Sequence, residues 1–420
     1  MPQDVLVIGG GMSGLILALG LVRAGHKATV FERADFDNAL PGQFKFGELG
    51  GGVAISTNGS QVLQDFGLWE EVQRKGGPLF NTRFCRIDGT LIAEVDVGEK
   101  ANRESVFVLR SALHEIMTTS ALKGGVKLFV CKQLVGIDQT EGRVTAHFKD
   151  GTSATGSVLI GADGIHSQTR ALIFEQAKTG DYPIFTGSQG HVGVSSLSPD
   201  DPLLKQVKAG LSFFTDSSNQ NTVELMFTSP SRLSWRVSDY SQEGKEVESW
   251  APATNLPKEV DRLAELVKSW GVPSYVTDVM RHAIRISPVS IYDRKSLKTW
   301  TVGNVTLIGD SAHGMPPHLG QGTNQALEDV AVLSELFQRF PDDASTCFKI
   351  YEALRIKRTT QFAENTRKMG AAQYTKTPIM RAIGELGIKG FVFAINRLGL
   401  NFEWDWRREL DKELKKAGKA

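Results

Sequence analysis

The sequence predicts an α/β fold: a Rossmann-like domain on a parallel sheet, an inserted domain with a mainly antiparallel β-sheet, and helices at the C-terminal end. Three observations predict it. Residues 1–33 read as strand, glycine turn, helix and strand. Two later apolar runs, which end at residues 160 and 308, again close with glycine and an acid. Residues 182–290 begin with separated strands that no helices interrupt, which indicates a different layer type.

The first unit consists of two buried strands and a helix. Residues 5–8 are apolar on both faces, as a strand inside a parallel sheet must be. Residues 15–24 place apolar side chains at helical spacing, and Gly25 is a suitable C-terminal stop. Residues 28–31 form the second buried strand, which leads to Glu32.

The turn between strand and helix has the pattern Gly9-x-Gly11-x-x-Gly14. Gly9 permits the sharp turn, Gly11 lets the backbone approach a pyrophosphate, and Gly14 lets the helix lie close to the sheet. The free N–H groups of Met12 and Ser13 lie at the positive helix end, where an anion is stabilised. Strand, helix and second strand are in register, so the motif predicts a dinucleotide site.

Glu32 narrows the choice of dinucleotide. It follows Gly14 by eighteen residues, the place from which a carboxylate accepts hydrogen bonds from an adenosine ribose. An acid at this position also repels a 2′-phosphate. The site therefore suits FAD or NAD and not NADP.

Composition limits the classes of function. The chain has 420 residues, enough for two or three domains, and its net charge of +1 gives no nucleic-acid footprint. Its three cysteines are far apart and its eight histidines lack HxxxH spacing, so we expect reduced thiols and no bound metal. The chain begins on its first strand, and no apolar run reaches the roughly 18 residues of a membrane span. We therefore expect a cytoplasmic protein.

Two stretches leave alternatives open. Residues 50–53 form a second glycine cluster before a helix near residues 59–66, and they read equally as a flexible loop or as backbone laid against a flat ring. Arg110 stands between a strand over residues 105–109 and a helix, and on its own it reads as a solvated surface arginine.

The remaining elements follow from periodicity. Residues 83–95 alternate around Asp88-Gly89 and predict a β-hairpin. Residues 311–319 read as a loop, residues 377–398 as apolar positions interleaved with basic ones, and the charged tail from residue 403 as a helix. Further strands are expected over residues 126–130, 133–139, 143–148, 157–160, 182–194, 210–214, 222–228, 233–238, 284–291 and 302–308, and helices over residues 260–269, 320–337 and 342–368.

Three buried strands thus end in turns that look functional: Ile8-Gly9, Gly161-Ala162-Asp163 and Gly309-Asp310. If they share one parallel sheet, the turns meet at the edge where open sheets bind ligands. This set resembles the three fingerprints of class A FAD-dependent monooxygenases, which have the p-hydroxybenzoate hydroxylase fold with a GR2-type FAD-binding domain and include salicylate hydroxylase-like enzymes. The resemblance covers roughly residues 1–370 and is most specific over residues 309–329.

The resemblance implies roles for these motifs. Glu32 would bind the adenosine ribose, and Arg110 would face the FAD pyrophosphate. Asp163 would lie near the pyrophosphate and assist nicotinamide docking, and Asp310 would hold the ribityl chain. Residues 51–53 would approach the isoalloxazine edge, and the helix opening at residues 320–324 would direct its positive end at the flavin. The expected cofactor-binding residues are Gly9, Gly11, Met12, Ser13, Gly14, Glu32, Arg33, Gly52, Val53, Arg110, Asp163, Asp310, Pro317, Gly320, Gly322, Thr323 and Asn324.

The resemblance also implies the reaction. NADPH or NADH would reduce FAD, oxygen would form a C4a-hydroperoxyflavin, and the distal oxygen would be transferred to an aromatic, phenolic or polycyclic substrate. The alternatives on the same fold are epoxidation, oxidative decarboxylation and halogenation. A further alternative is a membrane-associated flavin redox protein, because residues 377–398 are basic and amphipathic. We expect a monomer or homodimer.

The sequence departs from the family pattern in the predicted substrate domain. Residues 190–196 lack the arginine that many salicylate hydroxylase-like members carry there. His318 and His191 are candidates for substrate chemistry; the alternatives are a solvent-facing loop histidine and a packing histidine. Phe185, Met226 and Trp235 could line a ring pocket, although each reads more readily as ordinary core.

The resemblance sets the expected domain boundaries. The FAD-binding domain would comprise residues 1–79, 101–181 and 291–370. Residues 80–100 would be a hairpin of the substrate domain, residues 182–290 its β-sheet, and residues 371–420 a C-terminal helical segment.

Overall fold

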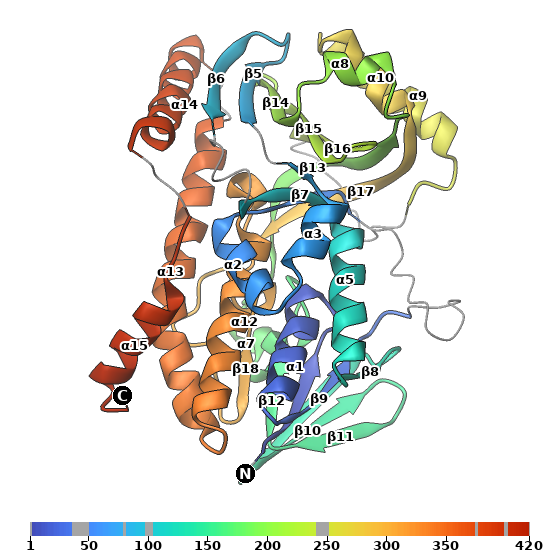
Figure 1. Ribbon diagram of the computed structural model, residues 1–420. Helices are drawn as coiled ribbons and strands as arrows, with labels where there is room; N and C mark the ends of the chain where they lie inside the picture. Colours follow the sequence, from blue (N-terminus) through green and yellow to red (C-terminus); the bar gives the residue numbers. More distant parts are fainter. Residues whose placement is uncertain are drawn as a thin grey trace.

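The computed structural model describes residues 2–35, 50–78, 81–96, 104–240, 252–373, 377–398 and 402–419. A parallel sheet with its helices forms the lower half of the molecule in Figure 1, and a large, mainly antiparallel sheet forms the upper half. Helix α13 (Ala344–Gln373) runs along both halves. The predicted α/β fold with an antiparallel sheet and C-terminal helices is confirmed.

The parallel sheet has the strand order β18-β12-β1-β2-β8. These strands are β1 (Asp4–Ile8), β2 (Lys27–Phe31), β8 (Lys127–Phe129), β12 (Val158–Gly161) and β18 (Val305–Leu307). All four neighbouring pairs are parallel. Residues 5–8 are at most 3% exposed, since the sheet is covered on both faces. The strands at the three predicted turns are therefore adjacent.

Helices cover one face of the parallel sheet. Helix α1 (Met12–Arg23) is buried between α5 (Arg110–Lys123) and α12 (Gly322–Arg339), and it ends where Gly25 takes a positive φ of 88°. The other face packs against a three-stranded antiparallel sheet of β9 (Leu134–Thr140), β10 (Arg143–Phe148) and β11 (Ser153–Gly156). Helix α15 (Trp406–Lys416) packs on α12 and α13.

A small sheet connects the two halves. It consists of β3 (Gly52–Ile55), β7 (Val106–Leu109) and β4 (Gly77–Pro78), with α2 (Thr57–Asp65) and α3 (Trp69–Lys75) beside it. Strand β3 also contacts strands of the large sheet. The glycine cluster therefore ends in a strand: Gly52 and Val53 belong to β3, and Gly50 and Gly51 directly precede it.

The large sheet has the order β17-β13-β16-β15-β14-β5-β6, with only the β14–β5 pair parallel. Its strands are β5 (Asn81–Arg86), β6 (Leu91–Asp96), β13 (Ile184–Ser196), β14 (Gly210–Asp216), β15 (Asn221–Ser229), β16 (Arg232–Tyr240) and β17 (Ala283–Asp293). One face packs against α8 (Pro202–Gln206), α9 (Leu256–Ser269) and α10 (Ser274–Arg281) around a core that includes Trp235. The opposite face is directed towards β3 and α13. We call it the inner face.

Several short helices were not predicted. The expected loop at residues 311–319 contains α11 (Asp310–His313) and a 3₁₀ turn, η1 (Pro317–Leu319). Helices α6 (Gln168–Ile173) and α7 (Gln176–Thr179) were also missed. Such helices depend on local capping rather than periodicity: the Ser167 hydroxyl, for example, accepts a hydrogen bond from the Arg170 amide.

Helix α14 (Pro378–Leu398) packs on β6 and leaves apolar side chains exposed. Ile379, Ile383, Leu386 and Phe393 are 55–75% exposed. Within the described ranges, no helix combines the length and the apolar character that crossing a membrane requires.

Candidate cofactor and substrate site

The three predicted turns lie side by side at the carboxyl edge of the parallel sheet. The Ala162 amide donates to the Ile8 carbonyl at 2.7 Å, and the Ile308 amide donates to the Gly161 carbonyl at 2.9 Å. Gly9 has a φ of 109°, and a Cβ atom there would overlap the Ala162 carbonyl. A glycine is therefore required where the first turn passes the second.

The start of α1 is open in the way an anion site requires. A Cβ atom on Gly14 would overlap the Gly9 carbonyl, so this glycine permits close helix–strand packing. A Cβ atom on Gly11 would meet no atom of the described residues within 4 Å. No side chain caps the helix and its first turn holds no acid, so the N–H groups of Met12 and Ser13 face the space beside Gly11.

Glu32 lies at the end of β2 and organises the glycine turn. Its Oε2 accepts from the Gly10 amide at 2.7 Å, and its Oε1 accepts from the Ala34 amide at 2.8 Å. The side chain remains partly exposed, so its other lone pairs can accept from a ribose. Arg33 follows with an exposed side chain.

Arg110 begins α5 and brings a cation to this space. Its amide donates to the Gly51 carbonyl at 2.9 Å, and its Cδ would lie 3.1 Å from a Cβ atom on Gly50. Burial lowers the pKa of Arg110, while the carboxylates of Asp310 and Glu32 act in the opposite direction. No hydrogen-bond acceptor for its guanidinium is seen among the described residues, so the site can pair it with an anionic ligand.

Asp310 follows the third turn, in which Gly309 has a φ of 60°. Its side chain is exposed while residues 305–309 are buried. The surrounding protein nevertheless raises the pKa of Asp310, an effect that the exposure of its side chain weakens, and His313 and Arg110 oppose that rise. One carboxylate oxygen lies 3.8 Å from a Cβ position on Gly322, at the start of α12. Asp310 therefore faces the positive end of that helix.

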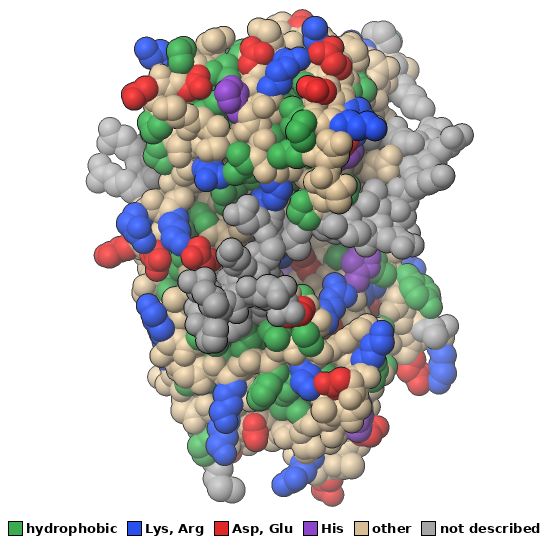
Figure 2. Space-filling model, turned by 90° about the vertical axis from the view of Figure 1, so that its right-hand side faces the viewer, with side chains coloured by type: hydrophobic (Ala, Val, Ile, Leu, Met, Phe, Trp, Pro, Cys, Tyr) green, Lys and Arg blue, Asp and Glu red, His purple; other side chains and the backbone are tan. Residues whose placement is uncertain are grey.

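The first turn of α12 is free of acids and of side-chain caps. Among the described residues, no acceptor is seen for the amides of Gly322 and Thr323. The positive helix end is thus directed at the space that Asp310 and Arg110 also border. Pro317 and Gly320 lie on the exposed rim of η1, immediately before this helix. On the face drawn in Figure 2, the surface is hollowed between the two halves of the molecule.

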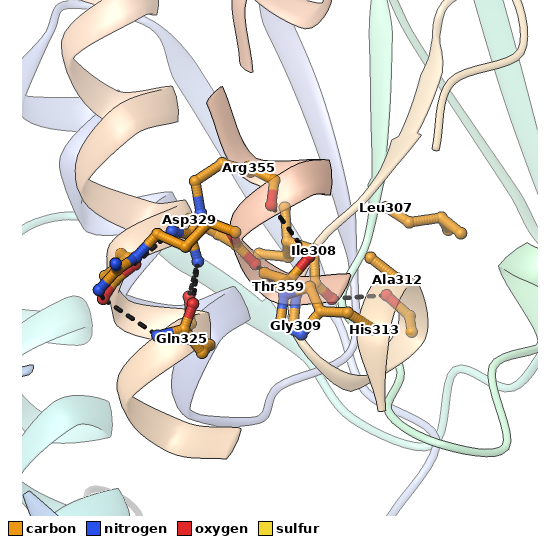
Figure 3. A network of polar contacts seen from close by, with 12 residues as sticks. Leu307, Ile308, Gly309, Ala312, His313, Gln325, Asp329, Arg355 and Thr359 are labelled. Atoms are coloured by element: carbon orange, nitrogen blue, oxygen red, sulfur yellow. Dashed lines mark hydrogen bonds and ion pairs between the residues drawn. The ribbon is translucent and has the colours of Figure 1, made fainter. Parts of the chain in front are cut away.

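A buried ionic network holds the third turn (Figure 3). Asp329 accepts from the Gly309 amide at 2.9 Å, from His313 Nε2 at 2.6 Å and from Arg355 Nε at 2.8 Å. Arg355 also donates to Glu328 and to both oxygens of Gln325. Burial would raise the pKa of Asp329, but His313 and Arg355 hold it below its ordinary value.

Asn324 binds backbone groups of two separate parts of the chain. Its Oδ1 accepts from the Ser56 amide at 3.0 Å, and its Nδ2 donates to the carbonyls of Ala54 and Gly320, both at 3.0 Å. The side chain therefore ties β3 to the start of α12.

Gly51 and Gly52 lie against the inner face of the large sheet. A Cβ atom on Gly51 would be 2.5 Å from both Ser234 and Val192 side-chain atoms, and one on Gly52 would overlap the Met226 sulfur. The Gly52 amide donates to the Ser234 hydroxyl at 2.9 Å. Contact with the sheet is thus one cause of this glycine cluster. Val53 pairs with Val108 in β7.

Asp163 is bound to the start of α6. It accepts from the Thr169 amide at 2.9 Å, the Thr169 hydroxyl at 3.0 Å and the Ser167 hydroxyl. Burial raises the pKa of Asp163, and these three hydrogen bonds oppose the rise. Its position at the end of β12 is as expected, and its contacts within the described residues are structural.

His318 lies in η1, half-buried against α13. Its Nε2 would be 2.6 Å from a Cβ atom on Gly370. Burial, together with the nearby charge of Arg236, lowers the pKa of His318 to about 4. The imidazole is therefore neutral at pH 7.

Arg236 and Glu224 form an ion pair on neighbouring strands of the inner face. Arg236 is directly opposite Val192 in the pairing of β13 with β16. Sequence reasoning missed this pair; its signal is two opposite charges at paired positions of neighbouring strands.

His191 lies on the opposite face of the sheet from Val192, because side chains alternate along a strand. Its Nε2 is 3.2 Å from Glu259 on α9. This placement gives no support to contact between His191 and a substrate on the inner face.

The three apolar candidates have different surroundings. Trp235 is 1% exposed in the core under α9 and α10, and its Nε1 donates to the Ser195 hydroxyl at 2.9 Å. Phe185 packs against Tyr292. Met226 lies on the inner face, next to Gly52.

Comparisons with known proteins agree with this geometry. Residues 3–366 match the family described as FAD binding domain. The chain is 29% identical over 373 residues to the 3-amino-4-hydroxybenzoate 2-monooxygenase PtnB3 of Streptomyces platensis, with 87% of each chain covered. It is 27% identical over 388 residues to a 3-hydroxybenzoate 6-hydroxylase of Polaromonas naphthalenivorans, with 88% of each covered.

Solved structures share the fold. A salicylate hydroxylase substrate complex superposes with a TM-score of 0.75 at 21% identity, covering 99% of this chain and 98% of the other. Klebsiella pneumoniae HpxO, complexed with FAD and uric acid, gives a TM-score of 0.76 at 21% identity and covers 98% and 96%. The chain is therefore a class A flavin-dependent monooxygenase, a member of the FAD binding domain family.

Proposed function

We propose that the protein uses NADPH or NADH and O2 to hydroxylate an aromatic ring. The observation that carries this proposal is the meeting of Arg110, Asp310 and the open end of α12 in one space, beside the inner face of the large sheet. The relatives named above act, by their names, on hydroxylated benzoates. They support a hydroxylated aromatic substrate for this chain.

The residues present fit FAD. The space beside Gly11 and the free amides of α1 suit a pyrophosphate, Arg110 suits its charge, and Glu32 suits the adenosine ribose. Asp310 suits a hydroxylated chain, because its carboxylate is exposed. When bound, FAD supplies the exchange of electrons with the nicotinamide and the activation of oxygen.

The chain's own residues position charge and exclude water. The positive end of α12 stabilises negative charge that develops near it. Strand β3 packs against strands of the inner face and borders the space, which limits the access of water to a substrate there. No protein nucleophile is required.

His318 is the proposed hydrogen-bond partner of a substrate hydroxyl. With a pKa of about 4 it is neutral and a weak base, so it is better suited to accept a hydrogen bond than to remove a proton completely. His318→Gln keeps a hydrogen-bonding side chain, whereas His318→Leu removes it. We expect His318→Leu to raise KM about tenfold and His318→Gln to have a smaller effect; equal kinetics for both variants and the wild type would remove this role.

The electrostatics around His318 favour an uncharged phenolic ring over a benzoate. Arg236 acts on His318 but is paired with Glu224, which leaves no net charge at that point, and Arg285, a buried cation of the same face, donates to the Gly50 carbonyl. An uncharged phenol or polycyclic phenol needs no counter-ion there. We therefore rank phenols above their carboxylated analogues as substrates.

The test is a screen with matched substrates. The FAD-loaded protein is given NADH or NADPH with phenols, hydroxybenzoates and polycyclic phenols, and nicotinamide oxidation is followed. The product is then analysed after reaction under ¹⁸O2. One labelled oxygen in a phenolic product supports hydroxylation, and a product without label argues against an oxygenase. An epoxide, a lost carboxylate or an added halogen favours epoxidation, oxidative decarboxylation or halogenation, respectively.

A second candidate role is attachment to a membrane surface as a flavin redox protein. The exposed apolar side chains of α14 favour it. Arg381, however, is bound to the Ser218 hydroxyl, which leaves Lys389 and Arg397 as the exposed basic side chains of the helix. Cosedimentation with anionic vesicles at low salt tests this role, and recovery of the protein in the supernatant rejects it. Light scattering of the protein without vesicles separates monomer from homodimer.

A further inference from the structure

The segment before α15 covers the ionic network that holds the third turn. The ring of Trp404 lies against the guanidinium groups of Arg355 and Arg358, which are 4.8 and 4.6 Å from its centroid. Trp404 is partly buried and packs against the core of the lower half. Trp404 lies beyond the end of the family match at residue 366, whereas Arg355 and Arg358 lie within it.

Both arginines act on acids of α12. Arg355 donates to Asp329 and to Glu328, and all three side chains are at most 1% exposed. Arg358 donates to both oxygens of Glu328, at 2.7 and 2.8 Å. Trp404 covers the outer side of these pairs, and exclusion of water strengthens ion pairs and cation–π contacts.

Glu328 and Asp329 in turn bind residues on two sides of the space proposed for the flavin. Asp329 binds the Gly309 amide, immediately before Asp310. Glu328 accepts from Nδ2 of Asn58 at 2.6 Å, and Asn58 lies in α2, directly after β3. A displacement of the two arginines would therefore change the positions of Asp310, α12 and β3.

We propose that Trp404 is a positioning residue for the flavin half of FAD. It fixes Arg355 and Arg358, and through Glu328 and Asp329 it sets the third turn and the start of α12. It does not touch the glycine turn after β1, which binds the adenosine half. The contribution is thus specific to one half of the cofactor.

The experiment compares two ligands in the same variants. Trp404→Leu keeps apolar volume but removes the aromatic face, and Trp404→Phe keeps the face. FAD affinity is measured by quenching of flavin fluorescence, and ADP affinity by calorimetry on the apoprotein. We expect Trp404→Leu to weaken FAD about tenfold with ADP affinity within a factor of two of wild type, and Trp404→Phe to recover most of the FAD affinity.

Two results would overturn the proposal: unchanged FAD affinity in Trp404→Leu, or equal weakening of FAD and ADP, which indicates general destabilisation. If Trp404→Leu is insoluble, Arg358→Met replaces it, because this variant removes a guanidinium from the ring without changing Trp404, although it also removes the Arg358 donors to Glu328 and to the Phe402 carbonyl. Arg358→Met is expected to lower FAD affinity while ADP affinity stays near that of wild type. An equal loss of affinity for both ligands would again reject the proposal. Neither readout depends on turnover, so failure here is separate from failure of the proposed reaction.

Discussion

The amide of Gly10 donates a 2.7 Å hydrogen bond to Oε2 of Glu32, so the acid at the end of β2 holds the glycine turn before any cofactor binds. The carbonyl of the same residue accepts from Nε2 of His114 at 2.8 Å. Gly10 is therefore held on both sides, by side chains from β2 and α5. The shape of the glycine turn depends on residues that are 22 and 104 positions away in the chain.

Replacement of Glu32 should weaken FAD binding, because Glu32 accepts hydrogen bonds both from the glycine turn and from a ribose. Glu32→Ala removes the acceptor for the Gly10 amide and the acceptor for a ribose. Loss of hydrogen bonds to a charged group costs about 1.5–3 kcal/mol, so we expect FAD affinity to fall about 10- to 100-fold. Glu32→Gln keeps one acceptor oxygen and is the control. Fluorescence titration measures both; wild-type affinity in Glu32→Ala would contradict the role.

His114 should make the stability of the apoprotein depend on pH. The side chain is 1% exposed, and burial lowers its pKa to about 4 from 6.5. Between these values the unfolded chain binds a proton that the folded chain does not, so stability is fully present above about pH 6.5 and is lost as pH falls towards 4. From pH 7 to pH 5 this loss is about 2 kcal/mol.

The measurement is urea unfolding of the apoprotein at pH 7 and pH 5. His114→Gln can still donate to the Gly10 carbonyl and does not titrate. We expect its stability to change by about 2 kcal/mol less than that of wild type between the two pH values. An identical change in both proteins would show that His114 is not the titrating group.

Asp310 should oppose folding and favour FAD. Its pKa is raised by enclosure, so its ionised form is less stable in the folded apoprotein than in the unfolded chain. Because solvent screens this exposed carboxylate, Asp310→Ala should leave the melting temperature of the apoprotein at or slightly above that of wild type, while it lowers FAD affinity about 10- to 100-fold. Asp310→Asn separates charge from hydrogen bonding. A variant with lower melting temperature and unchanged FAD affinity would contradict both statements.

The sequence was sufficient for the parts of the site that depend on local signals. Apolar β-branched runs followed by glycine predicted β1, β12 and β18, and the rule for parallel sheets predicted that their turns meet. The function of Gly9 and Gly14 followed from the turn alone. Fold and cofactor could be predicted because these signals are contiguous in the chain.

The sequence was insufficient where two distant elements pack. Gly51 and Gly52 contact Ser234 and Met226, which belong to another sheet, so no local pattern shows why glycine is needed there. Alternation places His191 on one face of β13 but does not say which face is directed at the flavin turns. The contact of Trp404 with Arg355 and Arg358 likewise depends on how α13 packs against the segment before α15.

Gly11 and Gly14 provide a matched pair that separates cofactor binding from folding. A Cβ atom on Gly11 meets no atom of the described residues within 4 Å, and its φ of −73° is suited to alanine, so Gly11→Ala should change the stability of the apoprotein by less than about 1 kcal/mol. A Cβ atom on Gly14 overlaps the Gly9 carbonyl, which is backbone and cannot turn aside. Gly14→Ala should therefore destabilise the apoprotein by about 2 kcal/mol or more.

The effects of these two substitutions on FAD affinity should differ from their effects on the stability of the apoprotein. The methyl group of Gly11→Ala enters the space in which a pyrophosphate would approach the backbone, so we expect FAD affinity to fall at least about tenfold in a protein that unfolds like wild type. Gly14→Ala should lose FAD affinity only together with stability. If Gly11→Ala bound FAD like wild type, the open space beside it would not be the pyrophosphate site, and the placement of the cofactor along Arg110 and Asp310 would have to be revised.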